Sequence, residues 1–283
     1  MRLVTFRLAD GDEDEPTHPG NRVGVLEDDG IAELAAPSML AWLAGEGREP
    51  TGTRHGLTDV VLLAPVPEPP SVRDFFAFEG HVAAGWRLRG AEVPAAWYDA
   101  PAFYFSNPAS IVGPAQPVAR PAATRALDFE LEIAAVLDAD GAIAGFTLLN
   151  DLSARDVQRA EMTVGLGPAK GKDFATALGP WLVTPDELPY EDGRLQLEAV
   201  VSVSGDEVAR SNAAEQHFSW PQIVAHAGRD TRLRAGDVLG SGTLTGGCLL
   251  ERNAGHPEPR WLEPGDVVEL AAPGLGILST PIV

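Results

Sequence analysis

Three acidic residues alternate with apolar ones in the segment DFELE, residues 128–132. Successive side chains of a strand point to opposite faces. A strand would therefore place Asp128, Glu130 and Glu132 on one face and the intervening apolar residues on the other. Like charges side by side are unfavourable unless a cation or solvent offsets them. The segment therefore indicates either a cation site or a solvated acidic face.

A fourth acid follows on the next predicted strand. The turn signal DADG, centred near residues 140–141, predicts a hairpin that brings Asp151 roughly opposite Glu130. Carboxylates that converge at one strand end suit a hard cation such as Mg²⁺, and an oxygen-only site also accepts Mn²⁺ or Ca²⁺. The alternative from the pattern alone is an edge strand with a solvated acidic face, with Asp151 as the cap of a helix expected at 152–162.

A histidine and two lysines are further candidates for chemistry. His81 follows a run of aromatic residues, and an unperturbed histidine pKa of about 6.5 suits a general base near neutral pH. It is one of six histidines, and the alternative is an ordinary surface or core residue.

Lys170 and Lys172, the two lysines of the chain, share one glycine-rich loop. That loop is not a phosphate-binding loop, because Leu166 stands where the motif needs glycine and Asp173 follows Lys172.

Composition narrows the class of protein. The chain has 283 residues, of which 45% are hydrophobic and 22% are charged, as is typical of a globular protein. Its net charge of −20 argues against nucleic acid and anionic membranes as partners, because neither is attracted to that field. The single cysteine, Cys248, excludes an intrachain disulfide and favours a reducing, cytoplasmic setting. We find no pattern of a signal peptide or membrane span.

The N-terminal elements that surround these residues are expected to be short. Residues 2–8 and 21–27 are predicted to form strands around the acidic loop 10–20, and residues 37–45 a short helix. The proline-rich stretch 64–71 is typical of a linker, so we place a domain boundary there.

Beyond that boundary the pattern favours strands. Residues 73–90 have a mixed pattern that predicts a helix, whereas residues 126–137 alternate cleanly and predict a strand. The remainder is mostly strand and turn. The expected fold class is therefore α+β and strand-rich, with a β-roll or sandwich-like body. We predict a small N-terminal β domain over residues 1–66 and a larger domain over residues 70–283.

Five short motifs, taken together and in order, resemble the fumarylacetoacetate hydrolase family. They are RDFFAFEGH at 73–81, DFELE at 128–132, NDLSARDVQ at 150–158, GKDF at 171–174 and GSGTLTGG at 240–247. The resemblance covers about residues 70–283, and the N-terminal part is loosely similar to the small β domain that often precedes the catalytic domain there. It implies a mixed β-roll catalytic domain, a homodimer, and Mg²⁺ or a similar ion at the substrate.

The resemblance also implies roles for individual residues. The implied metal ligands are Glu130, Glu132, Asp151 and Asp74, the last of which is found in the larger hydrolases of the family. The implied catalytic residues are His81 as general base, Glu251 as the acid that orients it, and Lys172 beside the metal. Residues implied to lie near the metal or the substrate are Tyr104, Arg155, Gln158 and Thr243, with Phe76 in the substrate-binding position.

The activity that this resemblance implies is hydrolysis of a C–C bond in a 1,3-diketo acid, such as an acylpyruvate or fumarylpyruvate, through a metal-bound enolate. Two departures argue against fumarylacetoacetate itself as the substrate. Phe76 stands where fumarylacetoacetate hydrolases proper carry a substrate-binding tyrosine. Gly90 stands near their arginine for the substrate carboxylate, although Arg87 or Arg89 could reach in from the same segment.

Other activities remain open at this stage. The same fold hosts decarboxylases of oxaloacetate-like acids, isomerases, and hydratases or dehydratases of 2-keto acids. All of them share a metal-bound enolate, so the ligands do not separate them. His81 together with Glu251 favours attack by water, hence hydrolysis. A cation-binding β protein without catalysis is a further alternative, and Lys172 and His81 speak against it because a binder needs neither.

Overall fold

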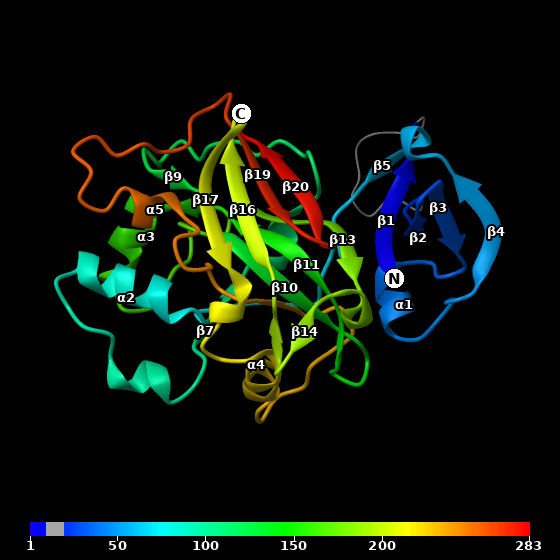
Figure 1. The fold of residues 1–283 in the computed structure, drawn as a ribbon, viewed down its shortest axis with the longest axis horizontal. Coiled ribbons are helices and arrows are strands. Elements are labelled where there is room, and N and C mark those ends of the chain that lie inside the picture. Colours follow the sequence, from blue (N-terminus) through cyan, green and yellow to red (C-terminus); the bar gives the residue numbers. More distant parts are fainter. Residues whose placement is uncertain (10–19) are drawn as a thin grey trace.

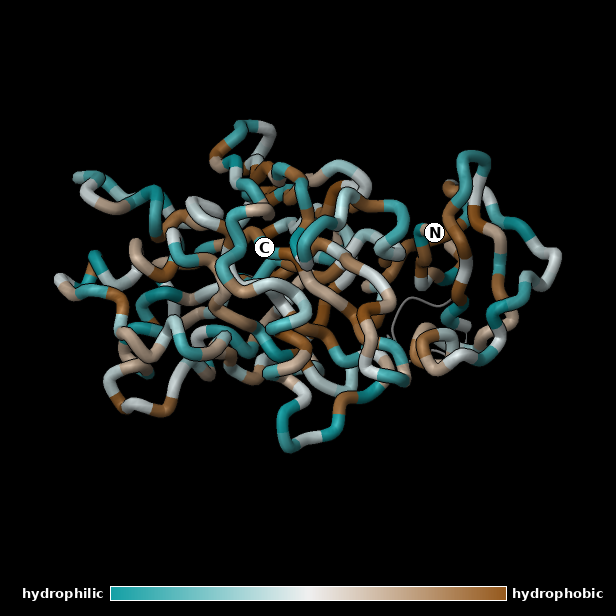
Figure 2. The backbone as a smooth tube through the Cα atoms, turned by 60° about the horizontal axis from the view of Figure 1, so that its bottom comes forward, coloured by the Kyte–Doolittle hydropathy of each residue, from teal (hydrophilic) through white to brown (hydrophobic). Residues whose placement is uncertain are grey.

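The structure is a computed structural model that describes residues 1–9 and 20–283. The expected acidic loop 10–20 lies, apart from its last residue, outside the described residues. The chain forms a smaller N-terminal lobe and a larger body (Figure 1). Hydrophobic stretches of the backbone run through the interior of both parts (Figure 2). Among the described residues, every helix is too short or too polar to cross a membrane.

The N-terminal lobe is an antiparallel sheet with one short helix. Its elements are β1 (Arg2–Leu8), β2 (Arg22–Glu27), β3 (Gly30–Leu34), α1 (Met39–Leu43), β4 (Pro50–His55) and β5 (Val60–Leu62). The strands pair in the order β4, β3, β2, β1, and β5 pairs with the other side of β1. The two expected strands and the short helix are therefore confirmed, and the hydroxyl of Ser38 caps α1 by accepting the N–H of Ala41.

The body is strand-rich and has short helices. Its strands are β6 (Val72–Phe75), β7 (Phe103–Ser106), β8 (Ile111–Val112), β9 (Leu127–Asp128), β10 (Leu131–Leu137), β11 (Ile143–Asp151), β12 (Ser153–Ala154), β13 (Thr176–Val183), β14 (Tyr190–Glu191), β15 (Arg194–Leu195), β16 (Glu198–Val203), β17 (Asp206–Asn212), β18 (Val238–Gly240), β19 (Val267–Ala272) and β20 (Gly276–Pro281). Its α-helices are α2 (Glu79–Leu88), α3 (Arg155–Met162), α4 (Trp220–Ala227) and α5 (Leu249–Arg252).

A 12-stranded mixed sheet runs through both parts of the molecule. Its path is β4-β3-β2-β1-β13-β11-β10-β18-β6-β7, so β1 of the lobe pairs with β13 of the body. A 4-stranded sheet, in the order β17-β16-β19-β20, forms a second layer. Figure 1 shows this layer, coloured yellow to red, in front of β10, β11 and β13. The fold is therefore α+β and strand-rich with a mixed sheet, as predicted.

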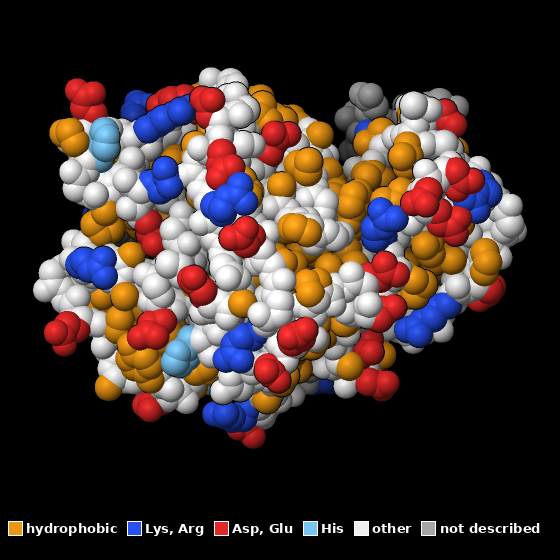
Figure 3. Space-filling model, viewed as in Figure 1, with side chains coloured by type: hydrophobic (Ala, Val, Ile, Leu, Met, Phe, Trp, Pro, Cys, Tyr) orange, Lys and Arg blue, Asp and Glu red, His pale blue; other side chains and the backbone are white. Residues whose placement is uncertain are grey.

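Apolar side chains cover both faces of β10. Leu131 and Ile133 belong to a large core that also contains residues of β16, β19 and β20. Ala134 and Val136 belong to a second core shared with the N-terminal lobe. The strand is therefore buried on both sides, and its acidic face is limited to the end that begins the hairpin. Charged side chains are instead scattered over the outer surface (Figure 3).

The expected helix over residues 73–90 is wrong in its first part. Val72–Phe75 forms β6, which pairs in parallel with β18 and antiparallel with β7. Aromatic and β-branched residues fit a buried strand between two partners, and this packing outweighs the local helical pattern. The helix begins at Glu79 and ends at Leu88. The motif at its start is thus divided, with Asp74 on a strand and His81 on a helix.

Candidate active site

The hairpin of β10 and β11 brings Glu130 and Asp151 together, as predicted. The N–H of Asp151 donates to the carbonyl of Glu130 at 3.3 Å. The side chains of Glu130, Glu132 and Asp151 are buried, which excludes a solvated acidic face. The alternative role of Asp151 as a helix cap is also wrong, because α3 follows Ala154 and has no side-chain cap.

Strand β6 adds Asp74 to the acids of the hairpin. One carboxylate oxygen each of Asp74, Glu132 and Asp151 lies within 4.8 Å of the others, and we call these three residues the carboxylate group. The oxygens Asp74 Oδ1, Glu132 Oε1 and Asp151 Oδ1 are buried without a hydrogen-bond partner among the described residues. Buried oxygens of this kind are satisfied by a hard divalent cation, so this donor set fits the predicted ion.

Gly240 leaves the space that this group needs. It lies on β18 beside Asp74, in parallel register. A Cβ at this position would lie 2.5 Å from Asp74 Oδ1 and 3.1 Å from Glu132 Oε2. Any larger residue would therefore displace one or both carboxylates.

The electrostatics of the carboxylate group also favour a bound cation. Burial raises the pKa of Glu132 well above its usual range, and the neighbouring Asp74 carboxylate adds to this effect. Burial likewise raises the pKa of Asp74 and of Asp151, against the opposing charge of Lys172. A divalent cation favours the ionised carboxylates and so offsets this cost.

Glu130 lies beside the carboxylate group and has partners of its own. Its Oε1 accepts a hydrogen bond from Nη2 of Arg155 at 2.6 Å, and its Oε2 accepts one from Nζ of Lys172. Burial opposes ionisation of Glu130, but the charges of Arg155 and Lys172 outweigh it and hold its pKa well below the usual range. Glu130 is thus an ionised carboxylate between two cations, and its role as a metal ligand stays a prediction.

Lys172 joins Glu130 to the carboxylate group. Its buried Nζ donates to Glu130 and to Asp151. Burial would lower the pKa of Lys172, but the charges of Asp151 and Glu130 outweigh it and raise this pKa, so the ammonium stays charged. The hydroxyl of Tyr104 donates to Asp151 Oδ2 at 2.7 Å. The predicted positions of Lys172 and Tyr104 near the acids are therefore confirmed, while their roles stay predictions.

The loop that carries Lys172 is tied to α3 by Glu161. This carboxylate accepts the backbone N–H groups of Ala169, Lys170 and Gly171 at 3.0, 2.6 and 3.0 Å. The side chain of Lys170 is exposed, so of the two lysines only Lys172 enters the site. Sequence reasoning missed Glu161, because nothing local shows that a glutamate at the end of a helix reaches a loop that follows it.

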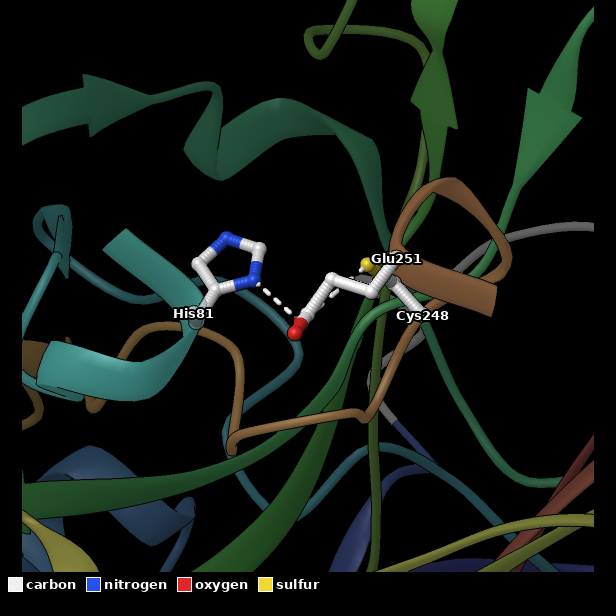
Figure 4. Close-up of side chains that lie close together, drawn as sticks. All are labelled: His81, Cys248 and Glu251. Carbon is white, nitrogen blue, oxygen red and sulfur yellow. Dashed lines mark hydrogen bonds and ion pairs between the residues drawn. The ribbon is translucent and has the colours of Figure 1, made fainter. Parts of the chain in front are cut away.

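His81 and Glu251 form a hydrogen-bonded pair between α2 and α5 (Figure 4). His81 Nδ1 lies 2.7 Å from Glu251 Oε1, and His81 Nε2 lies 3.9 Å from Glu130 Oε1. Glu251 also accepts the N–H of Gly246 and lies 3.6 Å from Sγ of Cys248. A carboxylate accepts hydrogen bonds, so Nδ1 is the donor to Glu251, and Nε2 is the ring nitrogen left to face a ligand.

Asp128, the first acid of the DFELE segment, lies outside the carboxylate group. It accepts a hydrogen bond from Nε of Arg155 at 2.8 Å, and it accepts the N–H groups of Leu249 and Leu250 at 2.7 and 3.0 Å. Those two N–H groups begin α5, the helix that carries Glu251. Asp128 therefore connects Arg155 to this helix. Strand alternation predicted that Asp128 lies on one face with the other acids, and it did not indicate these contacts with Arg155 and α5.

A cavity of about 350 Å³ contains the site. It is lined by all the predicted site residues except Asp151, namely Asp74, Phe76, His81, Tyr104, Glu130, Glu132, Arg155, Gln158, Lys172, Thr243 and Glu251. The ring of Phe76 meets that of His81 edge-on, with centroids 5.4 Å apart. Of the two arginines considered as a replacement near Gly90, Arg89 lines the cavity and Arg87 does not.

Two family models together match almost the whole sequence. The one described as fumarylacetoacetate (FAA) hydrolase C-terminal matches residues 71–283, and the one described as Rv2993c-like, N-terminal matches residues 1–65. The chain belongs to the fumarylacetoacetate hydrolase family. Enzymes of this family generally depend on a divalent metal, which agrees with the donor set of the carboxylate group.

Relatives within the fumarylacetoacetate hydrolase family carry different enzyme names. Fumarylacetoacetase of Oryza sativa subsp. japonica is 29% identical over 76% of this chain and 66% of its own length, so the chain spans about two thirds of that relative. The mitochondrial oxaloacetate tautomerase fahd2 of Xenopus laevis is 30% identical over 100% of this chain and 90% of its own. The crystal structure of 5-carboxymethyl-2-hydroxymuconate delta-isomerase from Mycobacterium smegmatis is 27% identical, with a TM-score of 0.74, over 100% of this chain and 99% of that one.

Proposed function

We propose that this protein is a divalent-metal-dependent hydrolase that cleaves a C–C bond in a small 1,3-diketo acid of the acylpyruvate or fumarylpyruvate type. One observation carries the proposal: the His81–Glu251 pair lines the same cavity as Asp74 and Glu132 of the carboxylate group. A histidine held by a carboxylate is a base for water, and hydrolysis needs such a base beside the group that is attacked.

The carboxylate group would hold the metal ion, with Glu130 beside it. When bound, the ion supplies a Lewis acid that stabilises negative charge on the two oxygens of a 1,3-dicarbonyl group. The donors are carboxylate oxygens, which suits Mg²⁺, Mn²⁺ or Ca²⁺.

His81 performs the proton transfer in this scheme. Its Nε2 takes a proton from water while the water oxygen attacks the acyl carbonyl, and Glu251 stabilises the imidazolium through Nδ1. The C–C bond then breaks, and its electron pair remains on the carbon of the pyruvate fragment, which receives a proton. The balanced reaction adds one water to the diketo acid and releases a carboxylic acid and pyruvate.

The remaining polar side chains position the substrate and offset charge. Lys172 stays charged at the edge of the cavity and stabilises the oxyanion that forms when water adds. Arg155 donates through Nη1 to Oε1 of Gln158 at 3.2 Å, which fixes the amide that faces the cavity. Tyr104 and Thr243 also line the cavity and complete its polar lining.

A tautomerase or isomerase of a 2-keto acid is the second candidate. The observation that favours it is coverage: the oxaloacetate tautomerase relative matches 100% of this chain, whereas the rice fumarylacetoacetase matches 76%. In that reaction His81 would move a proton between a carbon and an oxygen of the substrate, and no water would be consumed. Decarboxylation of an oxaloacetate-like acid and dehydration of a 2-keto acid would use the same metal site.

The two candidates differ in their products. Purified protein with Mg²⁺ or Mn²⁺ is incubated with acetylpyruvate, fumarylpyruvate, oxaloacetate and diketo sugar acids. Loss of the ultraviolet enol absorbance of an acylpyruvate, together with equimolar pyruvate, supports hydrolysis. Rapid ketonisation of enol-oxaloacetate with no pyruvate from any acylpyruvate would instead establish the tautomerase and overturn the hydrolase.

The assembly and location of the protein are also proposals. We propose a homodimer, as the family resemblance implies, and light scattering on the purified protein tests it. A cytoplasmic location is supported by the single buried cysteine, Cys248, which fits a reducing setting. The small-molecule substrate is the partner that the cavity supports, and nucleic acid is disfavoured by the net charge of −20.

A further inference from the structure

A second set of metal-ligating side chains lies outside the carboxylate group. His81, Cys248 and Glu251 each offer one ligand atom, and these three atoms lie within 4.8 Å of one another (Figure 4). We call these residues the mixed-donor cluster, because they combine an imidazole nitrogen, a sulfur and a carboxylate oxygen. The proposed function uses His81 and Glu251 and leaves Cys248 without a role.

The sulfur of Cys248 is held in place by the backbone around it. Cys248 forms an isolated antiparallel bridge with Glu130 and is the N-cap residue of α5. Its side chain is fully buried. Because α5 also carries Glu251, the sulfur and this carboxylate approach each other within one short segment. In Figure 4 the carboxylate of Glu251 contacts both the sulfur and the imidazole of His81.

The spacing of the mixed-donor cluster fits a tetrahedral zinc ion. Zinc bonds of about 2.3 Å to sulfur and about 2.0 Å to oxygen set those two ligand atoms about 3.5 Å apart. The distance from Cys248 Sγ to Glu251 Oε1 is 3.6 Å. His81 Nδ1 lies 2.7 Å from the same oxygen, so the imidazole would move outward by about half an ångström to admit the ion.

The donor atoms favour a different class of cation from the carboxylate group. Thiolate and imidazole suit Zn²⁺, whereas ligands that are all oxygen suit Mg²⁺, Mn²⁺ or Ca²⁺. A Cys248 thiolate and the Glu251 carboxylate together balance the charge of a divalent ion. Burial raises the pKa of the Cys248 thiol well above its usual range, and the charge of Asp128 adds to this effect. The group is therefore a neutral thiol until a cation binds.

The active-site cavity gives an ion access to the mixed-donor cluster. His81 and Glu251 both line this cavity, and Cys248 is buried beside them. Solvent in the cavity can supply the fourth ligand of a tetrahedral site.

We propose that the mixed-donor cluster binds Zn²⁺, and that the bound ion inhibits the enzyme. Binding replaces the hydrogen bond between His81 Nδ1 and Glu251. The thiol proton of Cys248 passes to solvent, and the imidazole becomes the tautomer that carries its proton on Nε2. That nitrogen can then no longer accept a proton. The inference goes beyond the proposed function, because the ion would block any reaction in which His81 acts as a base.

Cobalt spectroscopy tests occupation of the cluster without any substrate. Co²⁺, which can replace Zn²⁺ in such sites, is added to wild-type protein in saturating Mg²⁺. We expect one equivalent to produce the intense near-ultraviolet charge-transfer band of a thiolate bound to Co²⁺, and Zn²⁺ should remove this band. Cys248 is the only cysteine of the chain, so no other residue can give it. Absence of the band in wild type would overturn the proposal.

Two variants of Cys248 and one control locate the ion. Cys248→Ala and Cys248→Ser should lack the band and, by calorimetry in saturating Mg²⁺, bind Zn²⁺ at least about 100-fold more weakly, since even indirect partners of a metal site contribute roughly 10- to 100-fold. Serine keeps the side chain close to its original size, and circular dichroism checks both folds. The exposed His256 supplies the control His256→Ala, which should keep the band and the affinity. Equal zinc affinity in wild type and both cysteine variants would contradict the site.

The inhibitory effect is measured with acetylpyruvate and with enol-oxaloacetate. In saturating Mg²⁺, Zn²⁺ should inhibit wild type, and additional Mg²⁺ should not restore the rate. Each cysteine variant, compared with its own zinc-free rate, should need at least about 100-fold more Zn²⁺ for the same inhibition. Relief by Mg²⁺, or equal inhibition of wild type and the variants, would place the inhibiting ion at the carboxylate group and overturn the proposal. Failure to hydrolyse acetylpyruvate would instead count against the proposed function alone, because the cobalt band does not depend on turnover.

Discussion

His81 Nδ1 and Glu251 Oε1 lie 2.7 Å apart, although 170 positions separate the two residues along the chain. This contact fixes the orientation of the imidazole, so that Nε2 lies 3.9 Å from Glu130 Oε1. Glu130 is joined in turn to the carboxylate group through Lys172. His81, Glu130, Lys172 and the carboxylate group therefore form one connected set of side chains.

The first prediction concerns His81 as the base. His81→Ala should lower kcat for acylpyruvate hydrolysis by about 100- to 10,000-fold, the usual contribution of a positioned general base. Binding of Mn²⁺ should persist, because the carboxylate group remains intact. Steady-state kinetics and calorimetric metal titration measure the two effects. The exposed His256 supplies the control variant His256→Ala, and unchanged turnover in His81→Ala would refute the role of His81.

The second prediction concerns Asp128 as a positioning residue. Asp128→Asn removes the buried negative charge that pairs with Arg155 and meets the N–H groups at the start of α5. Because breaking a buried ion pair is costly, we expect a loss of about 3 kcal/mol in the free energy of unfolding. The pH profile of kcat should also shift, since α5 carries Glu251.

Urea unfolding and kinetics at several pH values test the role of Asp128. The control is Asp140→Asn, which changes an exposed aspartate in the turn between β10 and β11. A variant of Asp128 that is less stable but keeps the wild-type pH profile would limit this residue to a structural role.

The third prediction concerns the metal site. Mg²⁺ or Mn²⁺ at about 100 times its Kd should stabilise the protein by about 2.7 kcal/mol, and a chelator should remove the effect. Glu132→Gln should weaken metal binding by at least about 100-fold, since even indirect partners of a metal site contribute roughly 10- to 100-fold. Gly240→Ala should weaken it as well, because its Cβ would lie 2.5 Å from Asp74 Oδ1.

Thermal melts with and without metal measure this third prediction. The exposed Glu258 provides the control Glu258→Gln, which should keep the full metal-dependent shift in Tm. A full shift in both Glu132→Gln and Gly240→Ala would place the ion elsewhere.

The fourth prediction concerns pH and Glu161. Burial would raise the pKa of Glu161, but hydrogen bonds from three backbone N–H groups outweigh it and hold this pKa below its usual value. A carboxylate whose pKa is lowered in the folded protein stabilises the fold at pH values above its ordinary pKa. This stabilisation is lost as the pH falls through the lowered pKa. Glu161→Gln should therefore loosen the lysine loop at neutral pH, and the difference from wild type should disappear in acid.

Limited proteolysis by trypsin at Lys170 reports on that loop at neutral pH, and thermal melts follow stability as the pH is lowered. We expect faster cleavage and a lower kcat in Glu161→Gln, since Lys172 lies in the same loop. The matched control is Glu215→Gln, at an exposed glutamate elsewhere in the body. Equal cleavage rates in wild type and Glu161→Gln would show that the loop does not depend on this carboxylate.

Local sequence patterns correctly predicted the features that depend on residues close together in the chain. The period of two in residues 128–137 and the turn after them predicted a hairpin that sets Asp151 opposite Glu130, and this register is observed. Strand alternation and a tight turn determine such a register without help from the rest of the chain.

The helix expected over residues 73–90 shows where local pattern was insufficient. Its first residues instead form β6, because β18 and β7, which lie far away in sequence, pair with both of its edges. This pairing is what carries Asp74 to Glu132 and Asp151.

The amino-acid sequence was enough to predict the family, the strand-rich fold class and the residue types of the site, because these depend on ordered motifs and short-range periodicity. The different positions of the individual acids became apparent from the folded structure. It placed Asp74, Glu132 and Asp151 in one group, Glu130 between two cations, and Asp128 at the start of α5. Such a division depends on contacts between distant segments and on burial, neither of which a local pattern records.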